Sequence, residues 1–153
     1  FALYSLNIGK ENYYMYGEKS GLWFSRLAVA YVEHLEGTML SVLKHFPQFH
    51  KPMPFKRLKK LSENHISRGV CMGEGWLLTA EMAELIENGC NNIVCVQPFG
   101  CLPNHIVGRG KIRELKAAYP EANICPIDYD PGATKVNQEN RIKLMLANAK
   151  KTF

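Results

Sequence analysis

Apolar residues recur at helical spacing in the first part of the chain. Between Leu22 and Phe46 they follow one another in mixed steps, mostly of three to five residues, at Trp23, Leu27, Val32, Leu35, Leu40, Leu43 and Phe46. This spacing predicts an amphipathic helix. Gly37 predicts a break in it, and Pro47 ends it. The aromatic run at 13–16 fits either a short strand or a packed loop, so residues 1–20 carry no firm prediction.

A second, shorter helix is predicted after Pro54, because proline suits the first helical turn. Apolar side chains repeat on one face and basic ones crowd the other. The apolar face holds Phe55, Leu58 and Leu61, and the basic face holds Lys56, Arg57, Lys59 and Lys60. Residues 1–69 are therefore predicted to be mostly helical and to carry a basic patch, which Lys51 extends.

Helices and strands alternate after Gly69. Helices are predicted to end near Glu87, Tyr119 and Lys150, with strands over 92–96 and 122–128 between them. Short links between alternating elements predict an α/β fold with a Rossmann-like parallel sheet over residues 70–153. Two parallel strands make a small sheet, and the chain begins with Phe1 rather than Met. Both features suggest a fragment of a larger protein.

Composition and charge narrow the class of protein. The 153 residues are 46% hydrophobic and 22% charged, which is ordinary for a globular chain and excludes a disordered or fibrous one. The net charge of +5 lies in residues 1–70, with ten basic and five acidic residues, whereas residues 71–153 hold nine of each. The basic patch suits a CoA phosphate or an acidic redox partner, or is simply a solvated helix face.

Nucleic acid is not favoured as a partner, because no aromatic residues are interleaved with the basic patch. The apolar runs are too short to cross a membrane, which needs about 20 residues. Five unevenly spaced cysteines do not form a secreted disulfide framework. A cytoplasmic location is therefore expected.

Candidate chemistry is expected beyond the carboxyl ends of the two strands, where α/β sheets place their sites. Cys101 lies in a Pro- and Gly-rich loop after the first strand, and it could be a metal thiolate, a redox thiol or a packed residue. Gln97 and His105 bound this loop, and His105 would share a face with Cys101 if the loop were helical. Asp128 and Asp130 follow the second strand.

Other residues in this half are weaker candidates. Cys95 and Cys125 lie within apolar strands and are interpreted as small hydrophobic residues. The glycines at 73–75 and 108–110 precede predicted helices, and exposed helix N-termini attract phosphate. Neither matches a complete nucleotide-binding motif.

Three motifs carry a family resemblance. They are the segments GEGWLLTAEM at 73–82, QPFGCLPNH at 97–105 and IDYDPGA at 127–133. Together they resemble the C-terminal part of large acyl-CoA dehydratase activase-related proteins, which are similar to the 2-hydroxyglutaryl-CoA dehydratase and benzoyl-CoA reductase group. The resemblance is strongest over residues 70–150.

The resemblance implies an ATP-coupled iron–sulfur electron-transfer protein. In the family, Rossmann-like domains hold a [4Fe–4S] or related cluster, and separate domains hydrolyse ATP. Cys101 matches a loop cysteine that would bind the cluster, and Cys95 is the second choice. The nucleotide motifs and the other ligand cysteines are not recognisable here, so missing domains of the same polypeptide would supply them and this chain alone would be inactive.

Two other interpretations stay open. In the first, the chain is a structural or docking domain of the same large protein and holds no metal. In the second, it is a phosphate- or nucleotide-binding module that uses the turn at Gly108.

Overall fold

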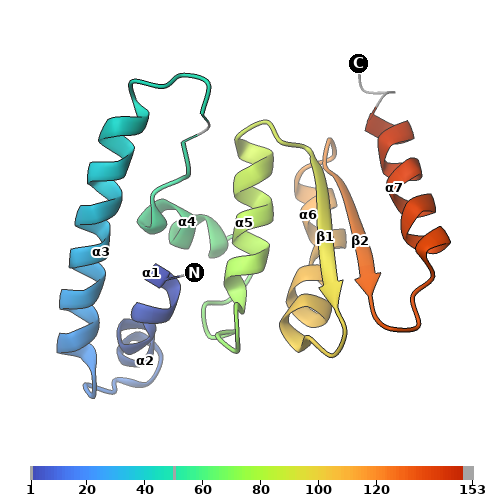
Figure 1. The fold of residues 1–153 in the computed structure, drawn as a ribbon. Helices are drawn as coiled ribbons and strands as arrows, with labels where there is room; N and C mark the ends of the chain where they lie inside the picture. Colours follow the sequence, from blue (N-terminus) through green and yellow to red (C-terminus); the bar gives the residue numbers. More distant parts are fainter. Residues whose placement is uncertain (1, 50, 150–153) are drawn as a thin grey trace. The chain divides into compact units, whose positions relative to one another are not determined.

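The computed structural model describes residues 2–49 and 51–149, in which consecutive helices are followed by two strands that alternate with helices (Figure 1). Contacts divide the chain between Lys60 and Leu61 into two compact units. The elements are α1 (Ala2–Leu6), α2 (Ile8–Tyr16), α3 (Leu22–Leu43), α4 (Phe55–Ser62), α5 (Trp76–Glu87), β1 (Asn92–Pro98), the π-helix η1 (Asn104–Arg109), α6 (Ile112–Ala118), β2 (Asn123–Tyr129) and α7 (Lys135–Ala149). The fold is thus mixed helix and strand, 59% helical, with a two-stranded parallel sheet.

Ser25 joins the first three helices of the N-terminal unit. Its hydroxyl donates a hydrogen bond to the Leu6 carbonyl at 2.6 Å and accepts one from the Gly9 N–H at 3.1 Å. Position 9 has no room for a side chain, because a Cβ there would lie 2.6 Å from the Ser25 Oγ. The aromatic run at 13–16 is the last turn of α2, and is neither a strand nor a loop.

The third helix, α3, is continuous, so the break predicted at Gly37 is wrong. A Cβ at Gly37 would meet nothing within 4 Å, so no packing contact forces a bend there. The inward face also differs from the prediction: Val29 is buried, whereas Trp23 is 74% exposed. Within the described ranges, no helix has both the length and the apolar character needed to cross a bilayer.

The basic helix α4 follows Pro54, as the sequence predicts. Phe55, Leu58 and Leu61 are all buried, and the basic residues of α4 occupy the opposite side. The hydrophobic face therefore fixes the orientation of the helix, and most of the positive charge is left toward solvent.

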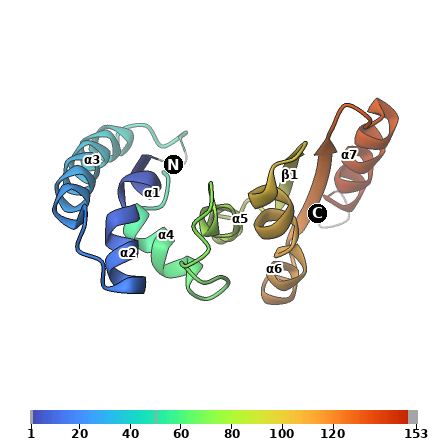
Figure 2. The ribbon, with the colours of Figure 1, turned by 90° about the horizontal axis from the view of Figure 1, so that it is seen from below.

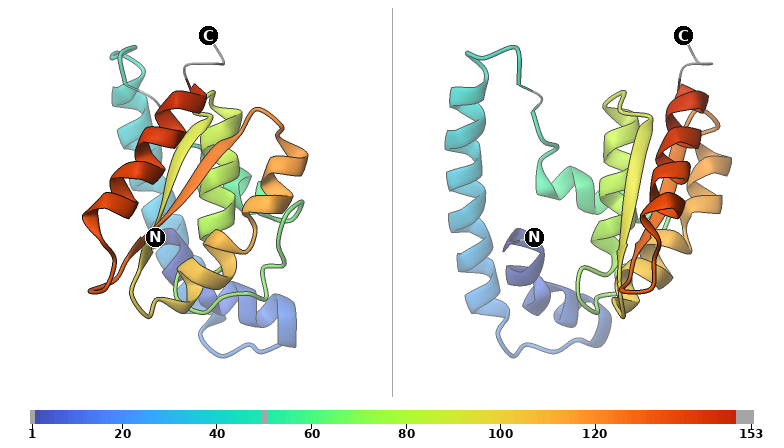
Figure 3. Two further views of the ribbon diagram at one scale, coloured as in Figure 1. Left: turned by 90° about the vertical axis from the view of Figure 1, so that its right-hand side faces the viewer. Right: turned by 45° about the vertical axis from the view of Figure 1, so that its right-hand side comes forward.

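The second unit alternates helix and strand in the predicted order. β1 and β2 pair in parallel, from Asn92 opposite Asn123 to Pro98 opposite Tyr129. The helix α7 lies on one face of the two strands, and α5 and α6 lie on the other (Figures 2 and 3). The strand β1 alternates between buried and exposed positions, so only one of its faces is covered.

The ends of this unit's elements follow local signals in the sequence. Gly89, directly after α5, has a φ of 83°, the left-handed conformation expected of a helix C-cap. The Thr134 hydroxyl accepts a hydrogen bond from the Asn137 N–H at 3.3 Å and so caps α7. Ile142 and Met145 are half-buried against the sheet as predicted, whereas Leu146 is exposed.

We predict that Gly37→Ala stabilises the chain by about 0.5–1 kcal/mol, because alanine lowers the entropy cost of a helix interior and its methyl group has free space. Urea unfolding followed by circular dichroism measures the change. Gly9→Ala is the matched control and should destabilise, since its methyl group meets Ser25. A loss of stability in Gly37→Ala would contradict a continuous α3.

Candidate functional site

The chain after β1 is helical, where the sequence predicts a loop. A helical segment begins at Leu102 and continues as η1. The His105 N–H donates a hydrogen bond to the Cys101 carbonyl at 3.2 Å, so the two residues belong to one turn. Short π-helices of this kind are often found at functional sites.

The wide turn of η1 depends on a glycine and on a threonine from α5. A Cβ at Gly110 would lie 2.1 Å from the Ile106 carbonyl oxygen, so only glycine fits there. The Thr79 hydroxyl donates to the buried Val107 carbonyl at 3.3 Å. Gly108 is buried inside η1, whereas Gly110 is exposed and α6 begins two residues after it, so a helix does follow these glycines as predicted.

Cys101 lies beyond the carboxyl end of β1, at the start of this helical segment. Its side chain is half-buried, and the Asn104 Nδ2 donates a hydrogen bond to its Sγ at 3.0 Å. A carboxamide donor stabilises negative charge on a sulfur atom. Asn104 was not singled out from the sequence, although its place three residues after Cys101 suits a contact across one helical turn.

Cys95 lies within β1 and is buried. Gln97, itself 1% exposed, donates from Nε2 to the Cys95 Sγ at 3.1 Å. Burial raises the pKa of the Cys95 thiol, and the hydrogen bond from Gln97 only partly opposes it. A Cβ at Gly108 would lie 3.3 Å from this sulfur, so glycine lets η1 approach β1. Cys95 thus fits a protonated packing residue better than a ligand.

Among the other predicted site residues, His105 shares a turn with Cys101, whereas Asp128 pairs with Arg109. Arg109 forms an ion pair with Asp128, with Nη1 3.1 Å from Oδ1. Asp130 is exposed in the turn before α7, and His105 is half-buried. In residues 2–49 and 51–149, no three histidine, cysteine or acidic side chains are grouped to hold a metal ion. These residues do not fit a complete cluster, and one thiolate from Cys101 is what they offer.

The basic patch divides into two kinds of residue. Lys59 is 2.5 Å from Glu11, whose side chain is buried, so this lysine contributes to the packing of the N-terminal unit. Lys51, Lys56 and Lys60 are exposed, and so is Arg57. These exposed residues keep their charge at the surface.

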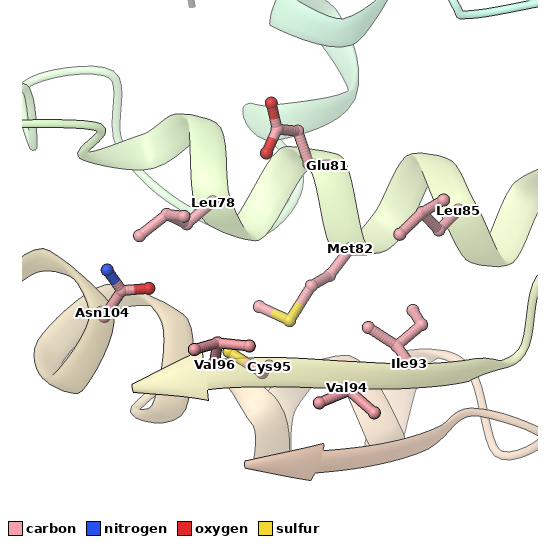
Figure 4. Close-up of a pocket in the computed structure, with 9 residues that line it drawn as sticks. All are labelled: Leu78, Glu81, Met82, Leu85, Ile93, Val94, Cys95, Val96 and Asn104. Atoms are coloured by element: carbon pink, nitrogen blue, oxygen red, sulfur yellow. The ribbon is translucent and has the colours of Figure 1, made fainter. Parts of the chain in front are cut away.

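An apolar groove runs along β1, between this strand and α5 (Figure 4). Its volume is about 260 Å³, and Asn104 closes one end of it. Met82 points from α5 toward β1, whereas Glu81 points away (Figure 4). Partial burial raises the pKa of Glu81, and the like charges of Glu84 and Glu74 add to this effect.

Comparison of the chain with family models, with curated proteins and with solved structures gives no match.

We predict that Cys95 reacts more slowly with iodoacetamide than Cys101 at pH 7.5. A raised thiol pKa lowers the thiolate fraction at every pH below it, and burial also restricts access. Peptide mass spectrometry after timed alkylation gives both rates in one sample, and the exposed Cys90 serves as the internal standard. Faster reaction at Cys95 than at Cys101 would contradict the assignment of Cys95 as the packed thiol.

Proposed function

We propose that this chain is a Rossmann-like part of a cytoplasmic, ATP-coupled iron–sulfur electron-transfer protein related to 2-hydroxyacyl-CoA dehydratase and its activase. Cys101 supplies one thiolate to a [4Fe–4S] or related cluster. The other ligands and the domains that hydrolyse ATP come from outside residues 1–153. The bound cluster would supply one-electron transfer at low potential.

The hydrogen bond from Asn104 to the Cys101 sulfur is the main support for this proposal. Hydrogen bonds to the sulfur atoms are one of the means by which proteins tune iron–sulfur clusters. The cysteine also lies beyond the carboxyl end of a parallel strand, where α/β folds place their ligands. The sequence also allows Cys101 to be a redox thiol or a packed residue. A redox thiol that forms a disulfide needs a second cysteine beside it. All five cysteines are free thiols in the described residues.

A metal-free docking domain is the second candidate function. It is favoured by the lack of a three-ligand group among the described residues. In both cases, the exposed Lys51, Lys56 and Lys60 are proposed to meet an acidic redox partner or the phosphates of an acyl-CoA. The first function requires bound iron and the second does not, so the iron content of the protein distinguishes them.

We predict that Cys101→Ser in the full-length polypeptide lowers the iron content by at least half after anaerobic reconstitution with iron and sulfide. Loss of one thiolate leaves a cluster incompletely ligated. Iron and acid-labile sulfide are measured per protein chain, together with the visible absorption of the cluster. Cys90→Ser is the matched control, because Cys90 is exposed and follows α5, at the other end of β1.

Iron content that is unchanged in Cys101→Ser would overturn the ligand role. A wild-type protein that binds no iron under these conditions would favour the docking function instead.

A further inference from the structure

The hydrogen-bond pattern of β1 determines which backbone groups face each of its edges. Phe99, just after β1, donates its N–H to the Tyr129 carbonyl at 3.2 Å, and the Asn91 carbonyl accepts the Asn123 N–H at 2.8 Å. In a parallel pair, alternate residues of a strand direct both backbone groups to the partner. The odd-numbered residues of β1 therefore face β2, and the even-numbered residues face the other edge.

The outer edge of β2 is closed. By the same alternation, Pro126 and Asp128 face this edge, and proline has no N–H to offer there. The Pro126 carbonyl accepts a hydrogen bond from Arg141 at 3.0 Å, and the Asp128 carbonyl accepts one from Gln138 at 3.0 Å. Side chains of α7 thus donate hydrogen bonds to the backbone carbonyls with which a further strand would have to pair. Natural sheets block their edges by such means.

The outer edge of β1 has no comparable protection. Val94 and Val96 direct their N–H and C=O groups to it, and no strand in the described part of the chain pairs with them. Their side chains are 41% and 45% exposed, because α7 packs on β2 and leaves this half of the face uncovered. An apolar strand edge with free backbone groups is a template for strand addition.

The groove beside this edge is apolar as well. Leu78, Met82 and Leu85 line it from α5, and Ile93 lines it from β1 (Figure 4). Leu85 is 40% exposed although it lies on a helix whose other apolar residues are mostly buried. A strand added to β1 would bring every second side chain into this groove.

We propose that the open edge of β1 binds one extended β-strand from polypeptide outside residues 1–153, parallel to β1 and apolar on the side that faces α5. The strand satisfies the backbone groups of Val94 and Val96, and its apolar side chains fill the groove beside Met82. This inference rests on the α/β part of the proposed function and not on the cluster.

A second copy of the chain fits this edge less well. The groove lies between α5 and the edge of β1, so α5 overhangs the line along which a new strand would pair. A copy related by a two-fold axis perpendicular to the sheet would bring its own α5 to the same side of that line. The α5 helices of the two copies would then occupy the same space beside the paired strands, which the side chains of a single added strand can fill.

The test uses a synthetic seven-residue peptide, in which valine and threonine alternate between terminal lysines, added to the isotope-labelled chain. We expect the amide signals of Val94 and Val96 to shift in nuclear magnetic resonance spectra, and their solvent exchange to slow at least tenfold. The Cys95 amide faces β2 and should change little. The same peptide with proline at its central position lacks one N–H and should have a much weaker effect.

A pair of protein variants tests whether the peptide binds through the backbone of the outer edge of β1. Val96→Pro removes an N–H that β2 does not use and should abolish the effect, whereas Val96→Thr keeps that N–H and should retain it. Protection of the Cys95 amide checks that each variant is folded.

Three results would overturn the proposal. One is the lack of any shift at millimolar peptide in a folded chain, and another is a response confined to the β2 edge. The third is protection of Val94 and Val96 without peptide, accompanied by dimers in analytical ultracentrifugation, which would assign the edge to a second copy. No iron enters this test, so failure here leaves the role of Cys101 standing.

Discussion

The parallel ladder between β1 and β2 is the contact on which the second unit depends. Parallel strands need a crossover connection, and η1 with α6 supplies it on the same face as α5. The ladder also brings the carboxyl ends of both strands to one end of the sheet. Cys101 follows one of these ends and Asp130 the other, so the candidate chemistry is a consequence of strand direction.

Two positions without a side chain shape the crossover, one at its contact with the sheet and one within its own turn. Gly108 lies against Cys95, and Gly110 lies against the Ile106 carbonyl. This close approach buries Gln97, whose Oε1 has no hydrogen-bond partner among the described residues. An unsatisfied buried polar atom costs about 1–3 kcal/mol. Gln97 therefore binds the Cys95 sulfur at a cost in stability.

The sequence predicted those features that local signals control. Alternating helix and strand patterns, Pro54 before α4, Gly89 after α5 and Thr134 before α7 all have a short-range physical cause. The π-helix was not predicted, because it depends on Thr79 in a different element and on a carbonyl contact at Gly110.

The prediction of the buried face of α3 failed for the same reason. In α3 the spacing alone could not show that Ser25 would bind α1 and α2 and so turn Trp23 outward. For the candidate site, the sequence located Cys101 but not Asn104. The sequence also did not show that Arg141 and Gln138 would bind the backbone carbonyls at the outer edge of β2, since these residues meet only in the fold.

The central claim is that this sheet has one closed edge and one open edge. Hydrogen exchange of the backbone amides, measured residue by residue in the chain alone, tests it most directly. We predict that Val94 and Val96 exchange at least about tenfold faster than Cys95 and Gln97, which alternate with them along the same strand. Equal protection of all four amides would contradict the account.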